Sequence, residues 1–237
     1  MSQSPIKLDT NEASDLRRWL SAVDSRAKPL SSGYQGAVYL YEGPTGARIV
    51  KEALGRGPQY WLGRAMLHRE FEAYQRVQGI AGIPCCYGML DDRFLVLEFV
   101  AGKGLRDTPM EPAARDRFFA KLLETLQRVH AAGVAHNDLK RKDNVLVAPD
   151  GSPVLLDFGL AFFRNGSSES WLFRLLKRMD YNSWIKIKYH AAIDAIAPED
   201  LPYYQPTVLE WGFRLWRRFW RTLTLRQWRK NRQAGKE

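Results

Sequence analysis

The sequence predicts an α+β domain with two unequal lobes, and three features of its pattern support this. Short apolar runs of strand character dominate about the first hundred residues, with one long helical pattern among them. A glycine-rich break follows at 101–104. Beyond the break, apolar residues recur mostly at helical spacing. We therefore expect a bilobal fold with an antiparallel N-terminal sheet plus one helix, and a reduced, mostly helical C-terminal lobe.

The whole chain is expected to form one domain, because 237 residues can bury a sizeable core. Its expected parts are an N-terminal lobe at 25–97, a hinge at 98–104, a C-terminal lobe at 105–205 and a basic, aromatic helix at 206–237.

In the N-terminal lobe, turn residues separate the apolar runs and so define the expected elements. A short helix at 15–23, with Ser14 as its cap, is expected before the lobe. The expected elements of the lobe, in order, are strands at 37–41 and 48–51, a loop at 54–63, a helix at 64–77, and strands at 84–88 and 94–100.

The C-terminal lobe should begin with a long amphipathic helix at 113–131, which Gly133 ends. A hairpin follows, with strands at 145–147 and 154–156 around a Pro-Asp-Gly turn. From Trp171 onward the pattern is helical, aromatic and basic.

Composition excludes several classes of protein. The two cysteines, Cys85 and Cys86, are adjacent, so they cannot form a disulfide framework and give no reason to expect an oxidising compartment. A structural zinc site has no support without a Cys-x-x-Cys pair. The first residues lack the apolar stretch of a signal peptide, and no run of about eighteen apolar residues predicts a spanning helix. We expect a cytoplasmic protein.

The most specific signal lies between residues 136 and 159. His-Asn-Asp-Leu-Lys at 136–140 is followed by Asn144 and, thirteen residues later, by Asp-Phe-Gly at 157–159. Phosphoryl transfer from ATP needs Mg²⁺ held by oxygen ligands, an acid that orients the attacking hydroxyl, and positive charge near the phosphates. Asp157 and Asn144 are candidate metal ligands at the two ends of the hairpin. Asp138 is the candidate proton acceptor, and Lys140 the candidate cation.

This set resembles the signatures of the protein kinase family. Isolated turn acids are an alternative explanation, but the ordered set with its spacing argues against it. The resemblance covers about Leu30 to Leu160 and implies a protein-kinase-like fold with ATP and Mg²⁺ as cofactors. The reduced C-terminal lobe looks like atypical kinases of the RIO and bacterial lipopolysaccharide (Kdo/heptose) types.

The upstream sequence resembles the parts of a kinase that bind ATP. Gly33, Gly36 and Val38 match the last two glycines and the valine of the glycine-rich loop, and Ser31 stands where the first glycine usually lies. Small residues let backbone N–H groups approach phosphates, and Val38 is expected to pack on the adenine. Lys51, thirteen residues after Val38, resembles the lysine that holds the α- and β-phosphates.

The lysine needs an acidic partner, and the next helix offers Glu70 and Glu72. We favour Glu70 because it shares the inward apolar stripe, whereas Glu72 lies off it. Further along, Glu98 and Val100 resemble the hinge that contacts adenine through its backbone.

The sequence departs from the family pattern around Asp138, and one further match to that pattern is misleading. Five residues separate Asp138 from Asn144, one more than usual, so Asp143 competes with Asn144 as the second metal ligand. Asn137 replaces the usual arginine, so a phosphorylated activation loop would lack its anchor and activity should not depend on it. Ala-Pro-Glu at 197–199 matches a family tripeptide by letters, but it follows the expected helix and is interpreted as coincidence.

The net charge of +10 is concentrated near the C-terminus, where residues 204–237 include nine basic and two acidic residues. Trp216, Phe219, Trp220 and Leu223 share one helical face, with arginines beside it. Such a helix can lie on an anionic membrane surface or pack on the lobe with its arginines in solvent, and we weigh these two equally. Nucleic acid, supported by charge alone, ranks lowest.

The acceptor is less well determined than the reaction. Lys140 is typical of protein serine/threonine kinases, which we favour by a small margin. The short C-terminal lobe and the basic tail favour a sugar hydroxyl on a glycolipid such as lipopolysaccharide, which would make the protein peripheral at the inner membrane. A nucleotide-binding pseudokinase adaptor is a third possibility, and the complete set of catalytic candidates argues against it.

Overall fold

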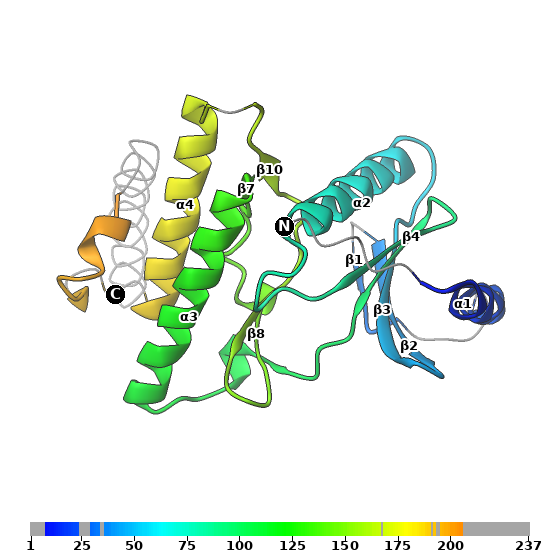
Figure 1. Ribbon diagram of the computed structural model, residues 1–237, viewed down its shortest axis with the longest axis horizontal. Helices are drawn as coiled ribbons and strands as arrows, with labels where there is room; N and C mark the ends of the chain where they lie inside the picture. The colour runs from blue at the N-terminus through cyan, green and yellow to red at the C-terminus, as the bar shows by residue number, and fades with distance from the viewer. Residues whose placement is uncertain are drawn as a thin grey trace, which may run out of the picture.

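In the computed structural model, a sheet-rich half and a helix-rich half lie side by side (Figure 1). This arrangement confirms the predicted α+β class, with an antiparallel sheet in the N-terminal region. The expected helix at 206–237 lies outside the residues that the structure describes. These residues are 8–23, 29–33, 36–166, 168–190, 192 and 195–205.

The N-terminal half is built on a five-stranded sheet of order β1-β2-β3-β5-β4, in which every neighbouring pair is antiparallel. Successive side chains along each strand point to opposite faces of the sheet, and both faces are covered. Neighbouring residues of a strand therefore have different surroundings. The strand bounds are Ser31–Gly33 (β1), Gly36–Gly43 (β2), Gly46–Glu52 (β3), Cys86–Leu90 (β4) and Phe94–Glu98 (β5).

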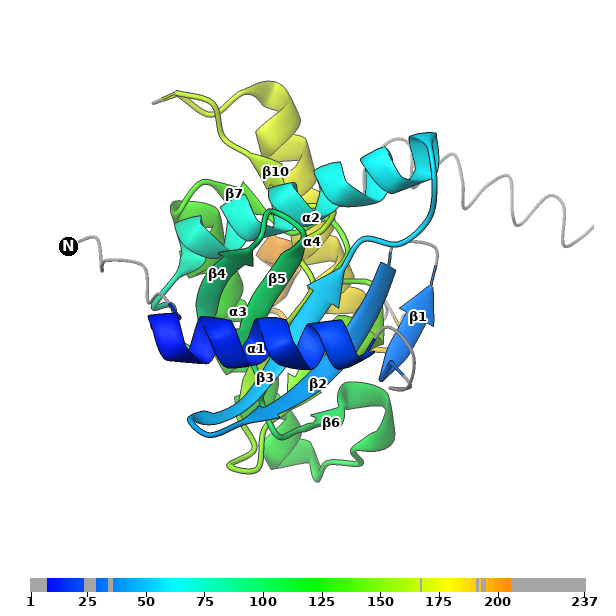
Figure 2. The same cartoon turned by 90° about the vertical axis from the view of Figure 1, so that its right-hand side faces the viewer.

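A helix packs on each face of this sheet. Helix α1 (Thr10–Val23) crosses the outer face (Figure 2). There the fully buried Leu16 packs in one cluster with Val50 and Val96. Helix α2 (Pro58–Val77) covers the face toward the other half of the molecule. The N-terminal half therefore contains the two helices that the sequence predicted, one before the lobe and one within it.

Both helices begin earlier than predicted. Helix α1 begins at Thr10 because Asp9 caps it: the Glu12 N–H donates to Asp9 Oδ1 at 2.7 Å. Ser14, the predicted cap, lies inside the helix. Helix α2 begins at Pro58, within the segment predicted as a loop at 54–63. Proline suits a first helical turn. Gln59, Trp61 and Leu62, which follow it, are exposed, so this turn shows no apolar periodicity.

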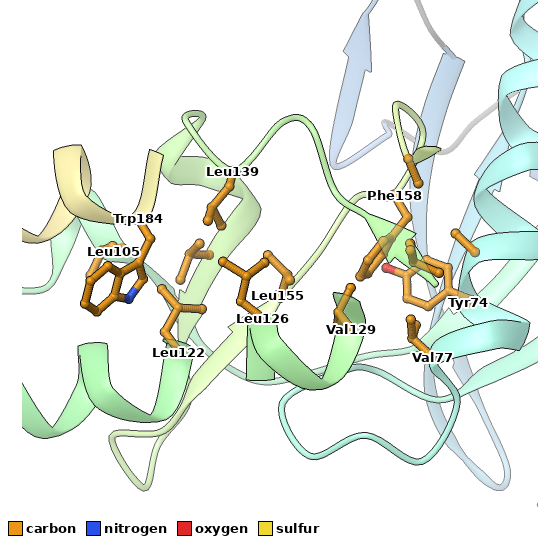
Figure 3. Close-up of a cluster of buried hydrophobic side chains, with 14 of the residues drawn as sticks. Tyr74, Val77, Leu105, Leu122, Leu126, Val129, Leu139, Leu155, Phe158 and Trp184 are labelled. Atoms are coloured by element: carbon orange, nitrogen blue, oxygen red, sulfur yellow. The ribbon is translucent and has the colours of Figure 1, made fainter. Parts of the chain in front are cut away.

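Two long helices dominate the C-terminal half, α3 (Pro112–Ala131) and α4 (Trp171–Lys188). Apolar side chains of α3 and α4 form one continuous core with the segments between them (Figure 3). Short strands complete this half. Their bounds are Lys103–Gly104 (β6), Val134–Ala135 (β7), Val145–Val147 (β8), Pro153–Leu155 (β9) and Phe162–Phe163 (β10).

The strands β8 and β9 form the predicted hairpin, and β6 pairs with β8. Strand β10 pairs with β7, which brings the segment after the hairpin back to the end of α3. Among the described residues, no helix combines the length and the apolar character needed to cross a membrane.

Candidate active site

Lys51 forms an ion pair on the inner face of the first sheet. The register places Val38 of β2 and Leu95 of β5 opposite it. Its Nζ lies 2.6 Å from Glu70 Oε1 and 3.6 Å from Asp157 Oδ1. Glu72 is exposed and pairs with Arg76 instead. Glu70, which the sequence favoured, is therefore the carboxylate of α2 that faces the lysine.

Lys51 and Asp157 stabilise the charged forms of each other. Burial disfavours the charged form of Lys51, but the attraction of Glu70 and Asp157 outweighs it and leaves the pKa of Lys51 above its usual value. Burial also opposes ionisation of Asp157. The charge of Lys51 and the N–H of Gly159 outweigh that effect and hold the pKa of Asp157 below its usual 3.8. Both groups are therefore charged near neutral pH.

Asp138 lies in the segment 136–144, which we call the catalytic loop, and is only 5% exposed. Asn144 holds it: the amide Nδ2 donates to the Asp138 carbonyl at 3.0 Å and to Asp138 Oδ2 at 3.2 Å. Asn144 is buried at the end of the 3₁₀ turn Lys142–Asn144, whereas Asp143 is exposed. This geometry favours Asn144 over Asp143 as the residue that acts together with Asp138.

Hydrogen bonds join the loop of Asp138 to the strand that precedes Asp157. His136 Nδ1 accepts from the Asp138 N–H at 3.2 Å, so its Nε2 carries the proton that is donated to the Leu156 carbonyl at 2.9 Å. The Leu156 N–H in turn donates to the Asn144 carbonyl at 2.8 Å. The two candidate metal ligands, Asn144 and Asp157, are thus held on neighbouring segments.

The chemistry of these two side chains suits Mg²⁺. Asn144 uses its side-chain amide N–H groups on Asp138, and its side-chain oxygen Oδ1 accepts no hydrogen bond from a described residue. Asp157 is anionic, and its side chain is 31% exposed. Amide and carboxylate oxygens are ligands that Mg²⁺ accepts, with phosphate oxygens and water completing its shell.

The glycine-rich segment forms the turn between β1 and β2. Gly33 pairs with Gly36, and Ser31 with Val38. Gly36 has a φ of +148°, and a Cβ there would lie 2.1 Å from the carbonyl oxygen of Glu52. Packing against β3 therefore requires glycine at this position, independently of any phosphate. Residues 34–35 lie outside the described residues.

The predicted hinge follows β5. Glu98 ends the strand, and its carboxylate accepts a hydrogen bond from the Cys85 N–H at 2.9 Å. The Glu98 N–H donates to the Cys85 carbonyl at 2.8 Å. The Glu98 side chain therefore holds this end of β5 to the chain before β4. Val100 lies beyond the strand, and its backbone is the expected contact for adenine.

Asp180 contacts the candidate site, and the sequence analysis missed it. It is 1% exposed on α4 and accepts hydrogen bonds from the backbone N–H groups of His136 at 2.7 Å and Asn137 at 2.8 Å. Its Oδ2 also lies 3.0 Å from His130 Nε2. One signal was available: Asp180 is the only acid in α4, and it shares a helical face with buried Phe173 and Trp184.

Phe158 joins the catalytic loop to α2. Its ring packs edge-on against His136, with centroids 4.8 Å apart. It also packs against Tyr74 of α2, with centroids 5.1 Å apart, and Figure 3 shows these two side chains together. Tyr74 lies one helical turn after Glu70, so this packing supports the position of the glutamate. His136 and Phe158 thus support the site structurally.

Hydrogen bonds from side chains to backbone carbonyl groups hold the chain after Gly159. Arg69 Nε donates to the Ala161 carbonyl at 2.5 Å, and Asn137 Nδ2 donates to the Leu160 carbonyl at 3.2 Å. Ala-Pro-Glu at 197–199 lies after α4, as the sequence indicated. The segment from β10 to α4 is short, and direct hydrogen bonds anchor its start.

Comparison with known proteins agrees with this geometry. A family model described as the protein kinase domain matches residues 28–189, well over half of the chain. The chain belongs to the protein kinase family. The match extends through α4 and so includes Asp180, beyond the region where the sequence motifs are recognisable.

Three similar kinases show how far the likeness extends. The serine/threonine-protein kinase AfsK of Streptomyces coelicolor is 34% identical over 56% of this chain, but only 17% of AfsK is covered. Serine/threonine-protein kinase PknL of Mycobacterium bovis is 31% identical over 60% of the chain and 37% of its own length. Human mitogen-activated protein kinase 12 is 31% identical over 62% of the chain and 43% of its own length. The chain thus spans less than half of these relatives.

Proposed function

We propose that this kinase-family chain transfers the γ-phosphoryl group of ATP, with Mg²⁺, to a serine or threonine hydroxyl of a protein. The observation that carries the proposal is the cluster of Lys51, Glu70 and Asp157, joined through Leu156 to Asp138 and Asn144. Two of the similar proteins above are named serine/threonine kinases, which supports this acceptor class.

In this proposal each residue has one task. Lys51, held by Glu70, binds the α- and β-phosphates, while Asn144 and Asp157 hold Mg²⁺, which neutralises charge on the phosphates. The glycine-rich turn from Ser31 to Val38 covers the nucleotide, and the backbone at 98–100 contacts adenine. Asp138 orients the acceptor hydroxyl and takes its proton. Lys140 was predicted to supply a further cation, and its side chain is exposed.

Activity without phosphorylation of the segment after Gly159 is part of the proposal. Arg69 and Asn137 donate hydrogen bonds directly to backbone carbonyl groups of that segment. The segment is therefore anchored without a phosphate group.

Transfer of labelled γ-phosphate from ATP tests the proposal. Generic protein substrates and purified lipopolysaccharide are offered in parallel, with Asp157→Ala as the inactive control. Label on serine or threonine that depends on Asp157 and Mg²⁺ is the expected result. ATP binding without Asp157-dependent transfer to any acceptor would instead favour the nucleotide-binding adaptor.

Lipopolysaccharide is included because of the short segment before α4, where protein kinases usually form part of their peptide platform. Label on the glycolipid alone would move the assignment to the lipopolysaccharide kinase type. The possible membrane surface contact depends on residues 206–237, outside the described residues. Equal sedimentation with anionic liposomes for the full chain and for a chain ending at Gln205 would exclude that contact.

Replacing Lys51 with methionine should lower turnover on the order of 10²- to 10³-fold, because a charge that faces the phosphates is lost. The buried Glu70 would also lose its partner, so the melting temperature should fall. Initial rates at saturating ATP and thermal unfolding measure both effects. Lys121→Met, which removes an exposed lysine beside Ser152, is the matched control. A wild-type rate for Lys51→Met would contradict the assignment.

A further inference from the structure

The loop between Asp138 and Asn144 contains one residue more than the usual kinase signature. Two successive turns close it: the Arg141 N–H donates to the Asp138 carbonyl at 3.2 Å, and the Asn144 N–H donates to the Arg141 carbonyl at 3.0 Å. Asn144 still reaches Asp138 with its side chain. The additional residue is therefore accommodated within the turns, and Arg141 stands at the corner where they meet.

This turn sends neighbouring side chains in different directions. Leu139 is fully buried and anchors the loop. Lys140 is exposed, and no carboxylate among the described residues lies within ion-pair distance of it. Arg141 points back, so that its Nη1 lies 3.7 Å from Asp138 Oδ2. The cation beside the candidate proton acceptor is thus a guanidinium, one position later than the sequence predicted.

The side chain of Arg141 is also largely open to solvent, with 57% of it exposed. An exposed guanidinium can turn toward an incoming phosphate without losing buried contacts.

We propose that Arg141, and not Lys140, contacts the phosphoryl group during transfer. The inference rests on the proposed function, because it concerns the same site. In that reaction the acceptor oxygen forms a bond to the γ-phosphorus, the bond from that phosphorus to the bridging oxygen breaks, and ADP leaves with the electron pair. The acceptor proton passes to Asp138. Arg141 stabilises the negative charge on the phosphoryl oxygens.

A guanidinium suits this task better than the ammonium of Lys140. Its N–H groups lie in one plane and match two oxygens of a phosphoryl group at once. Because it starts beside Asp138, it already lies near the position where the acceptor hydroxyl must be held. Charged donors placed before the reaction stabilise developing charge without reorganisation.

Binding of a transition-state mimic tests the proposal without relying on turnover. Calorimetric titrations with ADP and Mg²⁺, with and without tetrafluoroaluminate, compare wild type, Arg141→Met, Lys140→Met and Arg141→Lys. Arg128→Met, which removes an exposed arginine of α3 that pairs with Glu124, is the matched control. We expect Arg141→Met to lose about tenfold or more in affinity for the ADP–fluoroaluminate complex while keeping its affinity for ADP. Arg141→Lys should recover part of the loss.

The outcomes separate this inference from the proposed function. A larger loss for Lys140→Met than for Arg141→Met would overturn the assignment and restore Lys140. An equal loss of ADP affinity in Arg141→Met would also overturn it, since that indicates a role in nucleotide binding alone. If wild type binds the mimic but transfers phosphate to no acceptor, the acceptor part of the proposed function fails while the titrations still decide the role of Arg141. Absence of any nucleotide binding by wild type would overturn both.

Discussion

Asp138→Asn should remove phosphoryl transfer while leaving nucleotide binding nearly intact. The carboxylate is buried, and Asn144 Nδ2 fixes it from one side. An amide has nearly the same shape but cannot take the proton of the acceptor hydroxyl. Loss of general base catalysis typically lowers a rate on the order of 10²- to 10⁴-fold. Initial transfer rates at saturating ATP measure the effect, and a titration with ADP and Mg²⁺ measures binding.

Asp150→Asn provides the matched control for this substitution. Asp150 lies in the exposed turn between β8 and β9, where its carboxylate bonds to Ser152. We expect it to transfer phosphate at the wild-type rate. If Asp138→Asn also did so, Asp138 would not be the proton acceptor. If it instead lost ADP affinity and activity together, the residue would serve mainly to shape the nucleotide site.

Asp180→Ala is expected to have the largest effect on stability. The substitution removes the acceptor for two backbone N–H groups of the catalytic loop and for the buried imidazole of His130. Each buried donor left unpaired costs about 1–3 kcal/mol. Because neighbouring costs do not add fully, we expect a loss of about 3–5 kcal/mol in the free energy of unfolding. Urea titration followed by tryptophan fluorescence measures it.

The same substitution should lower turnover even where the protein remains folded. His136 and Asn137 directly precede Asp138, so releasing their N–H groups loosens the position of the catalytic carboxylate. Asp180→Asn keeps one carbonyl acceptor and should show a smaller loss of both stability and rate. Asp116→Ala, at an exposed position of α3, is the control. Stability equal to that control would show that α4 does not hold the loop through Asp180.

Sequence spacing was sufficient for the features that depend on neighbouring residues. The hairpin at 145–156 and the α3 helix follow from local apolar periodicity and turn residues, and the structure contains both. The pairing of Lys51 with Glu70 was also predictable, because a helical stripe decides which of two glutamates faces inward.

Apolar patterns were less informative about where a helix begins when its first turn is exposed. The structure begins α2 at Pro58, although Trp61 and Leu62 are exposed and interrupt the apolar stripe. A helix face without a burial pattern gives no periodic signal, so the sequence suggested a loop there.

By itself, the sequence determined that this chain carries the ordered residues of a kinase site, because their spacing along the chain is a local property. Only the tertiary structure decided which side chains of the Asp138 loop meet. It selected Asn144 over Asp143 and placed Arg141, in preference to Lys140, beside the carboxylate. It also brought Asp180 to the loop across 44 residues of sequence. Turn geometry and contacts between distant segments orient these groups, and neither leaves a periodic pattern in the sequence.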